Sequence, residues 1–371
     1  ADVAGKRVLA RVDFNVPMKD GRITDDTRIR AALPTLEDLL ARGAAVILVS
    51  HLGRPKGKPT PEFSLAPVAK HLEELIGRTV TLAGDVAGPR AQAAVSALQS
   101  GEVLLLENVR FEAGEEKNDP DLARGLASLA DVYVNDAFGS AHRAHASTVG
   151  VAELLPAYAG YLMDQELQAL QRLVVSPDRP YVAILGGAKV SDKLAVIGNL
   201  ASRVDAILVG GGMANTFLLA QGRHVGISLA EPDFVDQARS VLDDAQTRGV
   251  AVLLPSDVVV AGSLDGEGST VGVDAVADDV AIYDIGAESA RQFGERIAAA
   301  KTIFWNGPMG VFERPAFARG TLAVARAVAD ADAFSVVGGG DSVAAVEQAG
   351  VADRISHIST GGGASLEYVE G

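Results

Sequence analysis

The chain has 371 residues, and its 33 Lys and Arg against 48 Asp and Glu give a formal net charge of −15. This excess of acidic residues argues against general binding to nucleic acids or other polyanions. The length suggests about two domains, and a hydrophobic content of 48% supplies enough apolar surface for a folded core. The absence of Cys excludes disulfides, cysteine-ligated metal centres and thiol nucleophiles.

No stretch of the sequence approaches the ~20 apolar residues that a membrane-spanning helix needs. Residues 1–11 lack the basic and then apolar pattern of a secretion signal. We therefore expect a cytoplasmic protein that has neither membrane nor nucleic-acid partners.

Short runs of Val, Ile and Leu alternate with segments of helical period, which predicts strand–helix–strand units and parallel sheets. The expected strands of the first part cover residues 7–14, 44–50, 102–107 and 131–135. Residues 159–174 carry apolar side chains at helical spacing and predict a linking helix. The later strands are expected at 181–186, 205–210, 250–255, 302–305, 333–337 and 355–360. The predicted fold class is α/β, with two doubly wound parallel-sheet domains.

The charge is unevenly distributed along the chain. Residues 1–155 contain 18 basic and 21 acidic residues, whereas residues 156–371 contain 15 and 27. Four arginines of the first part follow expected strands or begin loops: Arg28, Arg54, Arg110 and Arg143. Ligands bind at the carboxyl ends of strands in doubly wound sheets, so these arginines predict an anion pocket. Each arginine alone could equally be a solvated surface residue.

Polar motifs follow the apolar strands of the first part. They are VDFNVP (12–17), SHLGRP (50–55), ENVRF (107–111) and AHRAH (141–145). Arginine can grip an anion through two parallel hydrogen bonds, while Asp and Asn hold hydroxyl groups. The combination of these residue types indicates a binding site for a small hydroxylated acid that bears a phosphate. His51 or His142 alone could also be a core histidine bonded to backbone.

Four glycine-rich turns follow strands of the second part. They are GGAK (186–189), GGGM (210–213), GGGD (338–341) and GGGA (361–364). Glycine lets a ligand approach the backbone, and a helix N-terminus attracts anions, so the turns predict phosphate binding. Tight strand-to-helix turns need glycine in any case. The G-x-G-x-x-G and G-x-x-x-x-G-K-[ST] spacings are absent, which disfavours a Rossmann dehydrogenase and a P-loop NTPase.

Two lysines accompany the first glycine turn. Lys189 and Lys193 are four residues apart, and we expect them on one face of a helix that Ser191 helps to start. They are suitably placed for phosphates, although a solvated helix turn is the alternative.

Two further segments suit a nucleotide. The segment NGPMGVFE (306–313) predicts a rigid loop for a base and ribose, with an ordinary turn as the alternative. Asp341 and Ser342 begin the segment after the third glycine turn. Asp341 could hold Mg²⁺ on a nucleotide, and both residues could cap a helix.

In these motifs the chain closely resembles phosphoglycerate kinase. The resemblance is carried by VDFNVP, SHLGRP, ENVRF, AHRAH, LGGAKVSDK (185–193), GGGMA (210–214), NGPMGVFE, GGGDS (338–342) and STGGGASLE (359–367). It covers nearly the whole chain in the family's order. It implies two domains that face a cleft, the first for 3-phosphoglycerate and the second for Mg²⁺ with ADP or ATP.

The resemblance also implies roles for individual residues. The residues implied to bind the substrate are Asp13, Asn15, Arg28, His51, Arg54, Arg110 and Arg143. The residues implied to bind the nucleotide are Gly187, Ala188, Lys193, Gly211, Gly212, Asn306, Pro308, Val311, Glu313, Gly340, Asp341 and Ser342. Asp341 would also be the metal ligand. The catalytic residues would be Arg28, Lys189, Gly340 and Gly363, of which Arg28 and Lys189 meet the transferred phosphoryl group.

By the same resemblance we expect a monomer with a phosphoglycerate-binding domain at 1–158, an interdomain helix and hinge at 159–177 and a nucleotide-binding domain at 178–360. Residues 361–371 would return toward the first domain. Family members usually continue for a few residues before Ala1 and in a tail beyond Gly371.

The implied reaction is reversible phosphoryl transfer from 1,3-bisphosphoglycerate to ADP, giving 3-phosphoglycerate and ATP. Both possible attacking oxygens are already ionised, so the reaction needs positioning and cations but no general base. A dinucleotide oxidoreductase is one alternative, but the required glycine spacing is missing. A noncatalytic phosphosugar-binding protein is another, and it leaves Lys189, Lys193, Glu313 and Asp341 without a role.

Overall fold

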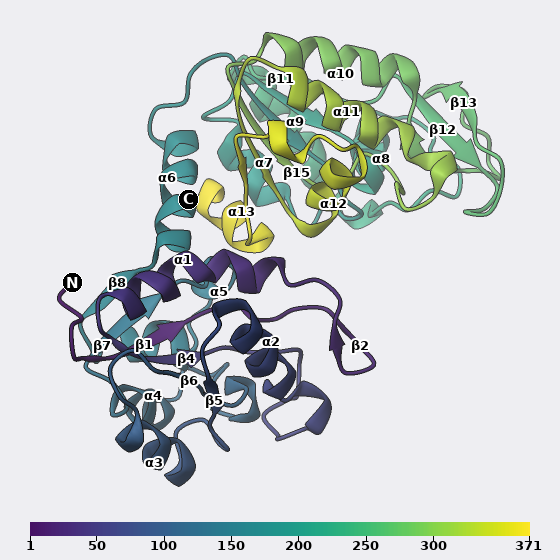
Figure 1. Ribbon diagram of the computed structural model, residues 1–371. Coiled ribbons are helices and arrows are strands. Elements are labelled where there is room, and N and C mark those ends of the chain that lie inside the picture. Colours follow the sequence, from purple (N-terminus) through teal and green to yellow (C-terminus); the bar gives the residue numbers. More distant parts are fainter. The chain divides into compact units, whose positions relative to one another are not determined.

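A computed structural model describes residues 1–371 and divides the chain into two compact units, Ala1–Leu167 and Gln168–Gly371 (Figure 1). The boundary falls inside α6 (Tyr161–Val174), which begins two residues after the start predicted for the linking helix. None of the helices is long and apolar enough to cross a membrane.

The first unit contains a six-stranded sheet in the order β5-β6-β4-β1-β7-β8. Its strands are β1 (Arg7–Arg11), β4 (Ala45–Val49), β5 (Val80–Leu82), β6 (Val103–Leu105), β7 (Val132–Asn135) and β8 (Ala157–Ala159). Every neighbouring pair is parallel, with Arg7 opposite Ala45 and Val8 opposite Val132 in the central register. A short antiparallel hairpin, β2 (Met18–Lys19) and β3 (Arg22–Ile23), lies outside this sheet.

Two apolar layers cover the faces of this sheet. The principal helices of the unit are α1 (Thr27–Ala41), α2 (Ala66–Ile76), α3 (Pro89–Ala97), α4 (Pro120–Ala127) and α5 (Phe138–Ala141). Val8 of β1 packs in one buried cluster with Ile29 of α1, whereas Leu9 packs in a second cluster with Val95 of α3. Successive strand residues point to opposite faces, so a central strand buried on both sides needs the uninterrupted apolar runs that the sequence shows.

The second unit has a matching six-stranded sheet in the order β11-β10-β9-β15-β16-β17. Its strands are β9 (Tyr181–Leu185), β10 (Ala206–Val209), β11 (Ala251–Leu253), β15 (Thr302–Asn306), β16 (Phe334–Gly338) and β17 (His357–Ile358). All of its pairs are parallel. The two parallel sheets confirm the predicted α/β fold class.

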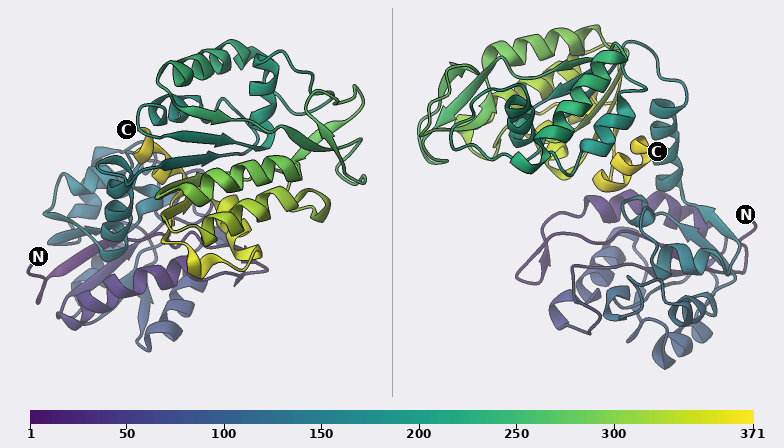
Figure 2. Two further views of the ribbon diagram at one scale, coloured as in Figure 1. Left: turned by 90° about the horizontal axis from the view of Figure 1, so that it is seen from above. Right: turned by 180° about the vertical axis from the view of Figure 1, so that it is seen from behind.

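Helices lie on both faces of the second sheet (Figure 2, left). They are α7 (Leu194–Leu200), α8 (Gly211–Ala220), α9 (Val235–Thr247), α10 (Ala287–Ala299), α11 (Arg319–Asp330), α12 (Gly340–Gln348) and α13 (Gly362–Glu370). Trp305 and Ile184 of the sheet are buried in one cluster with Phe293 of α10 and Val324 of α11. The last helix, α13, packs against α7 and β16.

A three-stranded antiparallel sheet was not predicted. It consists of β12 (Asp257–Ala261), β13 (Ser269–Gly272) and β14 (Ala281–Ile285), with β12 in the centre. Val258 and Val260 of β12 pack with Leu218 of α8 in a separate small core. The unit therefore has a second apolar wall beside α8, close to the glycine turns described below.

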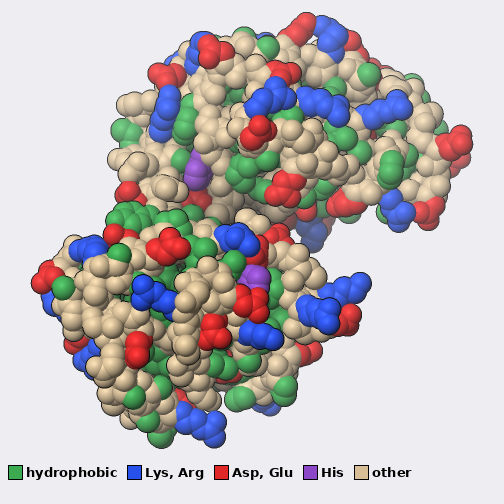
Figure 3. All heavy atoms as spheres, viewed as in Figure 1, with side chains coloured by type: hydrophobic (Ala, Val, Ile, Leu, Met, Phe, Trp, Pro, Cys, Tyr) green, Lys and Arg blue, Asp and Glu red, His purple; other side chains and the backbone are tan.

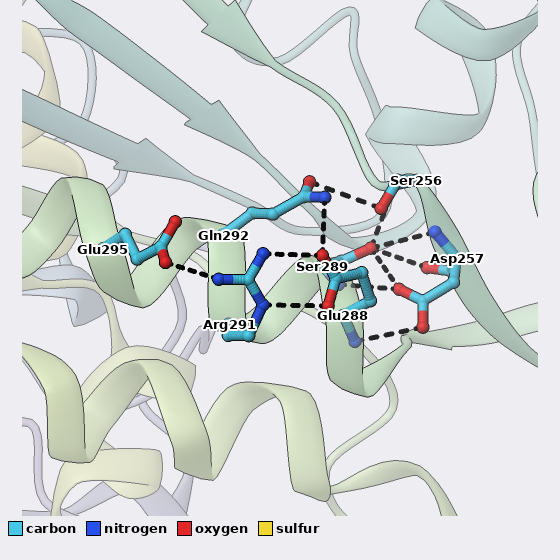
Figure 4. Close-up of polar contacts among 7 residues, drawn as sticks. All are labelled: Ser256, Asp257, Glu288, Ser289, Arg291, Gln292 and Glu295. Carbon is cyan, nitrogen blue, oxygen red and sulfur yellow. Dashed lines mark hydrogen bonds and ion pairs between the residues drawn. The ribbon is translucent and has the colours of Figure 1, made fainter.

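The start of α10 is fixed by the side chain of Asp257, the first residue of β12 (Figure 4). Asp257 accepts hydrogen bonds from the backbone N–H groups of Ser289 (2.7 Å) and Glu288 (3.1 Å). The Ser289 hydroxyl donates to Asp257 and accepts from the backbone N–H of Ser256 (2.9 Å). These contacts satisfy free N–H groups of the helix N-terminus, so the cluster is a helix cap.

The observed strands are mostly shorter than predicted. The strand predicted at 7–14 ends at Arg11, and the one predicted at 355–360 is reduced to two residues. Two edge strands, β5 and β8, were not predicted, because three-residue strands are too short to show a period.

On the face drawn in Figure 3, acidic and basic side chains are interspersed over the first unit.

Candidate active site

The first unit gathers its polar motifs at the carboxyl ends of adjacent strands. Asp25 accepts a hydrogen bond from the backbone N–H of Thr27 (2.8 Å) where α1 begins, which places Arg28 in the first turn. The Arg28 guanidinium lies 3.4 Å from the Asp13 carboxylate and donates to the Asn15 carbonyl (3.0 Å). The Arg28 guanidinium thus connects the start of α1 to the segment after β1.

Gly53 connects three of the motifs. Its N–H donates to Asn15 Oδ1 (2.9 Å), and its carbonyl accepts from Arg110 Nη1 (3.0 Å). The glycine has a φ of +60°, and a Cβ there would lie 2.3 Å from the ring of Phe63. A residue other than glycine would therefore disturb the loop that carries Arg54 and holds Arg110.

The cations of this cluster differ in burial. Arg110 is only 8% exposed, and burial lowers the pKa of its guanidinium, with the nearby charges of Arg11 and Arg143 acting in the same direction. Its Nε is buried and makes no hydrogen bond, and it lies 3.8 Å from the Glu116 carboxylate. Arg54 and Arg143 are exposed. The arrangement offers several guanidinium groups to one anion.

His51 lies at the back of the cluster and is buried. Its Nδ1 is 3.1 Å from Nη2 of Arg11. Burial lowers the pKa of the His51 imidazole well below its usual value, and the charges of Arg11, Arg110, Arg28 and His145 lower it further. Because a guanidinium can only donate, Nδ1 accepts and Nε2 carries the proton of the neutral ring.

Two buried residues that were not predicted, Ser147 and Glu115, hold the buried side chain of Arg11 in place. Arg11 Nε donates to the Ser147 hydroxyl (2.8 Å), and that hydroxyl donates to Glu115 Oε2 (2.5 Å). Glu115 also accepts from the Ser147 backbone N–H (2.7 Å). All three side chains are fully buried. The series of hydrogen bonds from Glu115 through Ser147 and Arg11 to His51 links segments far apart in the sequence. No local sequence pattern identifies this network.

The second unit has a cavity of about 220 Å³ beside the turns that follow β9, β10 and β15. Eight of the residues implied for nucleotide binding line it, namely Gly187, Ala188, Gly211, Gly212, Pro308, Val311, Glu313 and Asp341. Its remaining wall includes Leu229, Val258, Ile282 and Tyr283, none of which was predicted. An apolar wall with glycine turns at one side suits a flat base followed by phosphates.

Glycine is required in these turns because their backbones touch. A Cβ on Gly211, whose φ is +70°, would lie 2.6 Å from the Gly187 carbonyl oxygen. A Cβ on Gly186 would lie 2.0 Å from the Pro308 carbonyl oxygen. The N–H of Gly187 donates to that same oxygen (3.1 Å). The three turns therefore form one packed edge of the cavity.

Lys193 and Ser342 do not line the cavity but support its turns. The Lys193 ammonium donates to the carbonyls of Gly186 and Asn306, and the Ser342 hydroxyl accepts from the Gly307 N–H (2.6 Å). Burial lowers the pKa of Lys193 to about 8, while the charges of Asp192 and Asp341 oppose that shift.

The predicted placement of the two lysines on one helix face is wrong. The helix α7 begins at Leu194, after both Lys189 and Lys193, which lie in the preceding loop. The Ser191 hydroxyl binds the Glu231 carboxylate (2.7 Å) instead of capping the helix. Lys189 is exposed.

Asp341 and two glycines mark the starts of the last helices. Gly340 begins α12 and Gly363 lies in the first turn of α13. Asp341 is exposed, lines the cavity and makes no hydrogen bond or ion pair with its side chain. No group of three or more acidic or histidine side chains could hold a metal ion. One free carboxylate fits Mg²⁺, which takes most of its other ligands from phosphates and water.

Two α/β units, one with clustered guanidinium groups and one with a glycine-lined cavity, are the features expected of an enzyme that binds an acidic substrate and a nucleotide. A sequence model described as phosphoglycerate kinase matches residues 1–371. The phosphoglycerate kinase of Moorella thermoacetica is 60% identical over 372 residues, covering 100% of this chain and 95% of the relative. That of Herpetosiphon aurantiacus is 58% identical over 375 residues with the same coverage.

Solved structures agree with these sequence relationships. Phosphoglycerate kinase from Coxiella burnetii has a TM-score of 0.91 at 45% identity, covering 100% of this chain and 95% of that one. The enzyme from Pyrococcus horikoshii has a TM-score of 0.87 at 38% identity, covering 100% and 94%. The chain belongs to the phosphoglycerate kinase family and has phosphoglycerate kinase activity. It is thus a phosphotransferase with a carboxyl group as acceptor, and it acts in glycolysis.

Proposed function

We propose that the two substrates of this reaction are divided between the two units. Phosphoglycerate is bound in the first unit by Asp13, Asn15, Arg28, His51, Arg54, Arg110 and Arg143. The magnesium nucleotide is bound in the second unit by the cavity residues, with Lys193, Asn306, Gly340 and Ser342 supporting or completing the site. The observation that carries the proposal is that the two sets of residues lie on separate units, each near strand ends of one parallel sheet.

In the first unit, the guanidinium groups bind the carboxylate and phosphate of the acid. Arg110 Nε makes no hydrogen bond and donates to the ligand in place of its long contact with Glu116 (3.8 Å), while Arg54 and Arg143 are exposed and can reorient toward the ligand. His51 donates from Nε2 because Nδ1 is held by Arg11. Asp13 and Asn15 take the hydroxyl group, since carboxylate and amide oxygens accept from O–H donors.

In the second unit, the base packs on the apolar wall and the phosphates extend toward the glycine turns. The Gly212 N–H at the start of α8 and the N–H groups at the start of α12 make no backbone hydrogen bond and face anions favourably because of the helix dipole. Asp341 would hold Mg²⁺ on the nucleotide, and the ion offsets negative charge on the phosphate oxygens when bound.

The transfer step depends on electrostatic stabilisation. Lys189 and Arg28 both direct positive charge to the phosphoryl group as it moves in line between a carboxylate oxygen and the terminal phosphate oxygen of ADP. Gly340 and Gly363 let the backbone at two helix starts approach the same group. Neither attacking oxygen carries a proton to be removed, so no side chain acts as a general base.

Hydrogen exchange on the intact chain tests this division. Saturating 3-phosphoglycerate should slow amide exchange in the loops of the first unit around Gly53 and Arg110. Magnesium ADP should slow exchange around Gly187, Gly211 and Asp341. Protection of the Gly53 loop by ADP alone, with no change in the glycine turns of the second unit, would overturn the proposal.

A further inference from the structure

The loop that carries Lys189 is tied to a distant segment of the same unit. Both oxygens of the Glu231 carboxylate accept hydrogen bonds from Ser191, one from its backbone N–H (2.9 Å) and one from its hydroxyl (2.7 Å). Ser191 lies only two residues after Lys189. A single carboxylate therefore fixes both the backbone and the side chain of a residue two positions after the exposed lysine.

Glu231 is itself held by α8, the helix whose first residues line the nucleotide cavity. Its backbone N–H donates to the hydroxyl of Thr216 (3.0 Å), which is buried on α8. The adjacent Asn215 donates to the carbonyl of Leu229 (2.9 Å), and Leu229 lines the cavity. The segment 229–231 is thus anchored to the same helix at two points, which makes it a fixed support.

The backbone is also fixed before Lys189. The Gly187 N–H donates to the Pro308 carbonyl (3.1 Å), and the Gly187 carbonyl accepts from the Met213 N–H (3.0 Å). After Lys189, the side chain of Val190 is fully buried. Lys189 is therefore an exposed side chain on a short stretch of backbone that is held at both ends.

The charge of Glu231 suits this role. Burial acts to raise the pKa of its carboxyl, but hydrogen bonds from Ser191 and Val190 outweigh that effect and the pKa is lowered. The charge of Lys189 lowers it further, although the two residues form no ion pair. The carboxylate is ionised at neutral pH and holds the loop without neutralising the lysine by direct contact.

We infer that Glu231 is a positioning residue for phosphoryl transfer, which acts through Ser191 to hold the Lys189 ammonium in the geometry that the transferred group requires. The inference rests on the role proposed above for Lys189. Electrostatic stabilisation depends strongly on placement, and a displacement of about 1 Å can cost on the order of 100-fold in rate.

Steady-state kinetics on four variants of the full chain tests this inference. Glu231→Ala should lower kcat about tenfold or more while the KM for magnesium ADP changes less than about twofold. Ser191→Ala, which removes one of the two hydrogen bonds, should lower kcat less. Ser191→Thr keeps both donors and should restore kcat. Glu288→Ala removes an exposed glutamate of the same unit, paired with Arg291 (Figure 4), and should leave kcat unchanged.

A double-mutant cycle with Lys189→Ala separates positioning from a general effect on folding. If Glu231 acts through Lys189, Glu231→Ala should have little further effect on kcat in the Lys189→Ala background. An equal loss in both backgrounds, or a rise in KM without a loss in kcat, would overturn the inference. If Lys189→Ala alone leaves kcat unchanged, the proposed role of Lys189 fails and the inference falls with it. Should Glu231→Ala fail to fold, the Ser191 pair decides the question.

Discussion

Nη2 of Arg11 lies 3.1 Å from Nδ1 of His51, and both side chains are buried. Because the guanidinium is always a donor, this contact fixes which ring nitrogen of His51 accepts and which carries the proton. The substrate is an anion, so a buried neutral imidazole with a directed N–H can bind it without the cost of burying another charge.

The first prediction is that His51 stays neutral, with its proton on Nε2, as the pH falls from 8 through 6.5. Burial and the surrounding cations lower its pKa well below the ordinary value of 6.5. Nitrogen-15 NMR of the histidine rings should show one tautomer across this range, whereas Arg11→Met should show both tautomers and a higher pKa. Protonation of His51 in the native protein near pH 6.5 would contradict the assignment.

A consequence for stability follows from the same pKa. The unfolded chain binds a proton at His51 below about pH 6.5, and the folded chain does not. Acidification therefore favours the unfolded state, and stability should fall as the pH drops below 6.5. Urea unfolding at several pH values measures the free energy of unfolding. In His51→Gln, the part of its pH dependence that comes from His51 should be absent.

The second prediction concerns Lys193, whose pKa is lowered to about 8 by burial. Its ammonium is charged below pH 8 and loses its proton above that value. The affinity for magnesium ADP should therefore weaken severalfold between pH 7 and pH 9.5 in the wild-type chain. In Lys193→Met, calorimetry should show weaker binding at pH 7 and no such pH dependence. Constant wild-type affinity up to pH 9.5 would exclude a charged role for Lys193.

The alternation of apolar strands and helical segments predicted both parallel sheets, because a doubly buried strand leaves a strong signal in the sequence. The small sheet of β12, β13 and β14 was missed, although Tyr283 and Val258 from it line the cavity of the second unit. Its edge strands are partly exposed and carry weak patterns. The lysine pair was misplaced because a spacing of four also occurs in loops, and only tertiary contacts such as that of Glu231 with Ser191 distinguish the two.

The third prediction is that Gly211→Ala disrupts nucleotide binding. The new Cβ would lie 2.6 Å from the Gly187 carbonyl oxygen, so the packed turns must separate. Gly249→Ala is the matched control, because Gly249 has a similar φ of +74° with no atom within 4 Å of a Cβ. Both changes should destabilise the fold by about 1 kcal/mol or more through the positive φ. Only Gly211→Ala should raise the Kd for ADP tenfold or more, and equal affinities in the two variants would refute the steric explanation.

The fourth prediction is that Lys189 acts chiefly on the transition state. Lys189→Ala should lower kcat by ~10²-fold or more, because a single electrostatic stabiliser is removed, with little change in nucleotide affinity. A rise in the KM for ATP without a loss of kcat would make Lys189 a binding residue instead.

The most direct test of the division of substrates is calorimetry on Arg143→Ala and Asp341→Ala with each substrate separately. Both side chains are exposed and neither has a buried partner, so both variants should fold normally. Arg143→Ala should bind 3-phosphoglycerate at least tenfold more weakly and magnesium ADP as the wild type does. Asp341→Ala should show the reverse. The opposite pattern, or loss of both ligands in either folded variant, would contradict the assignment of one substrate to each unit.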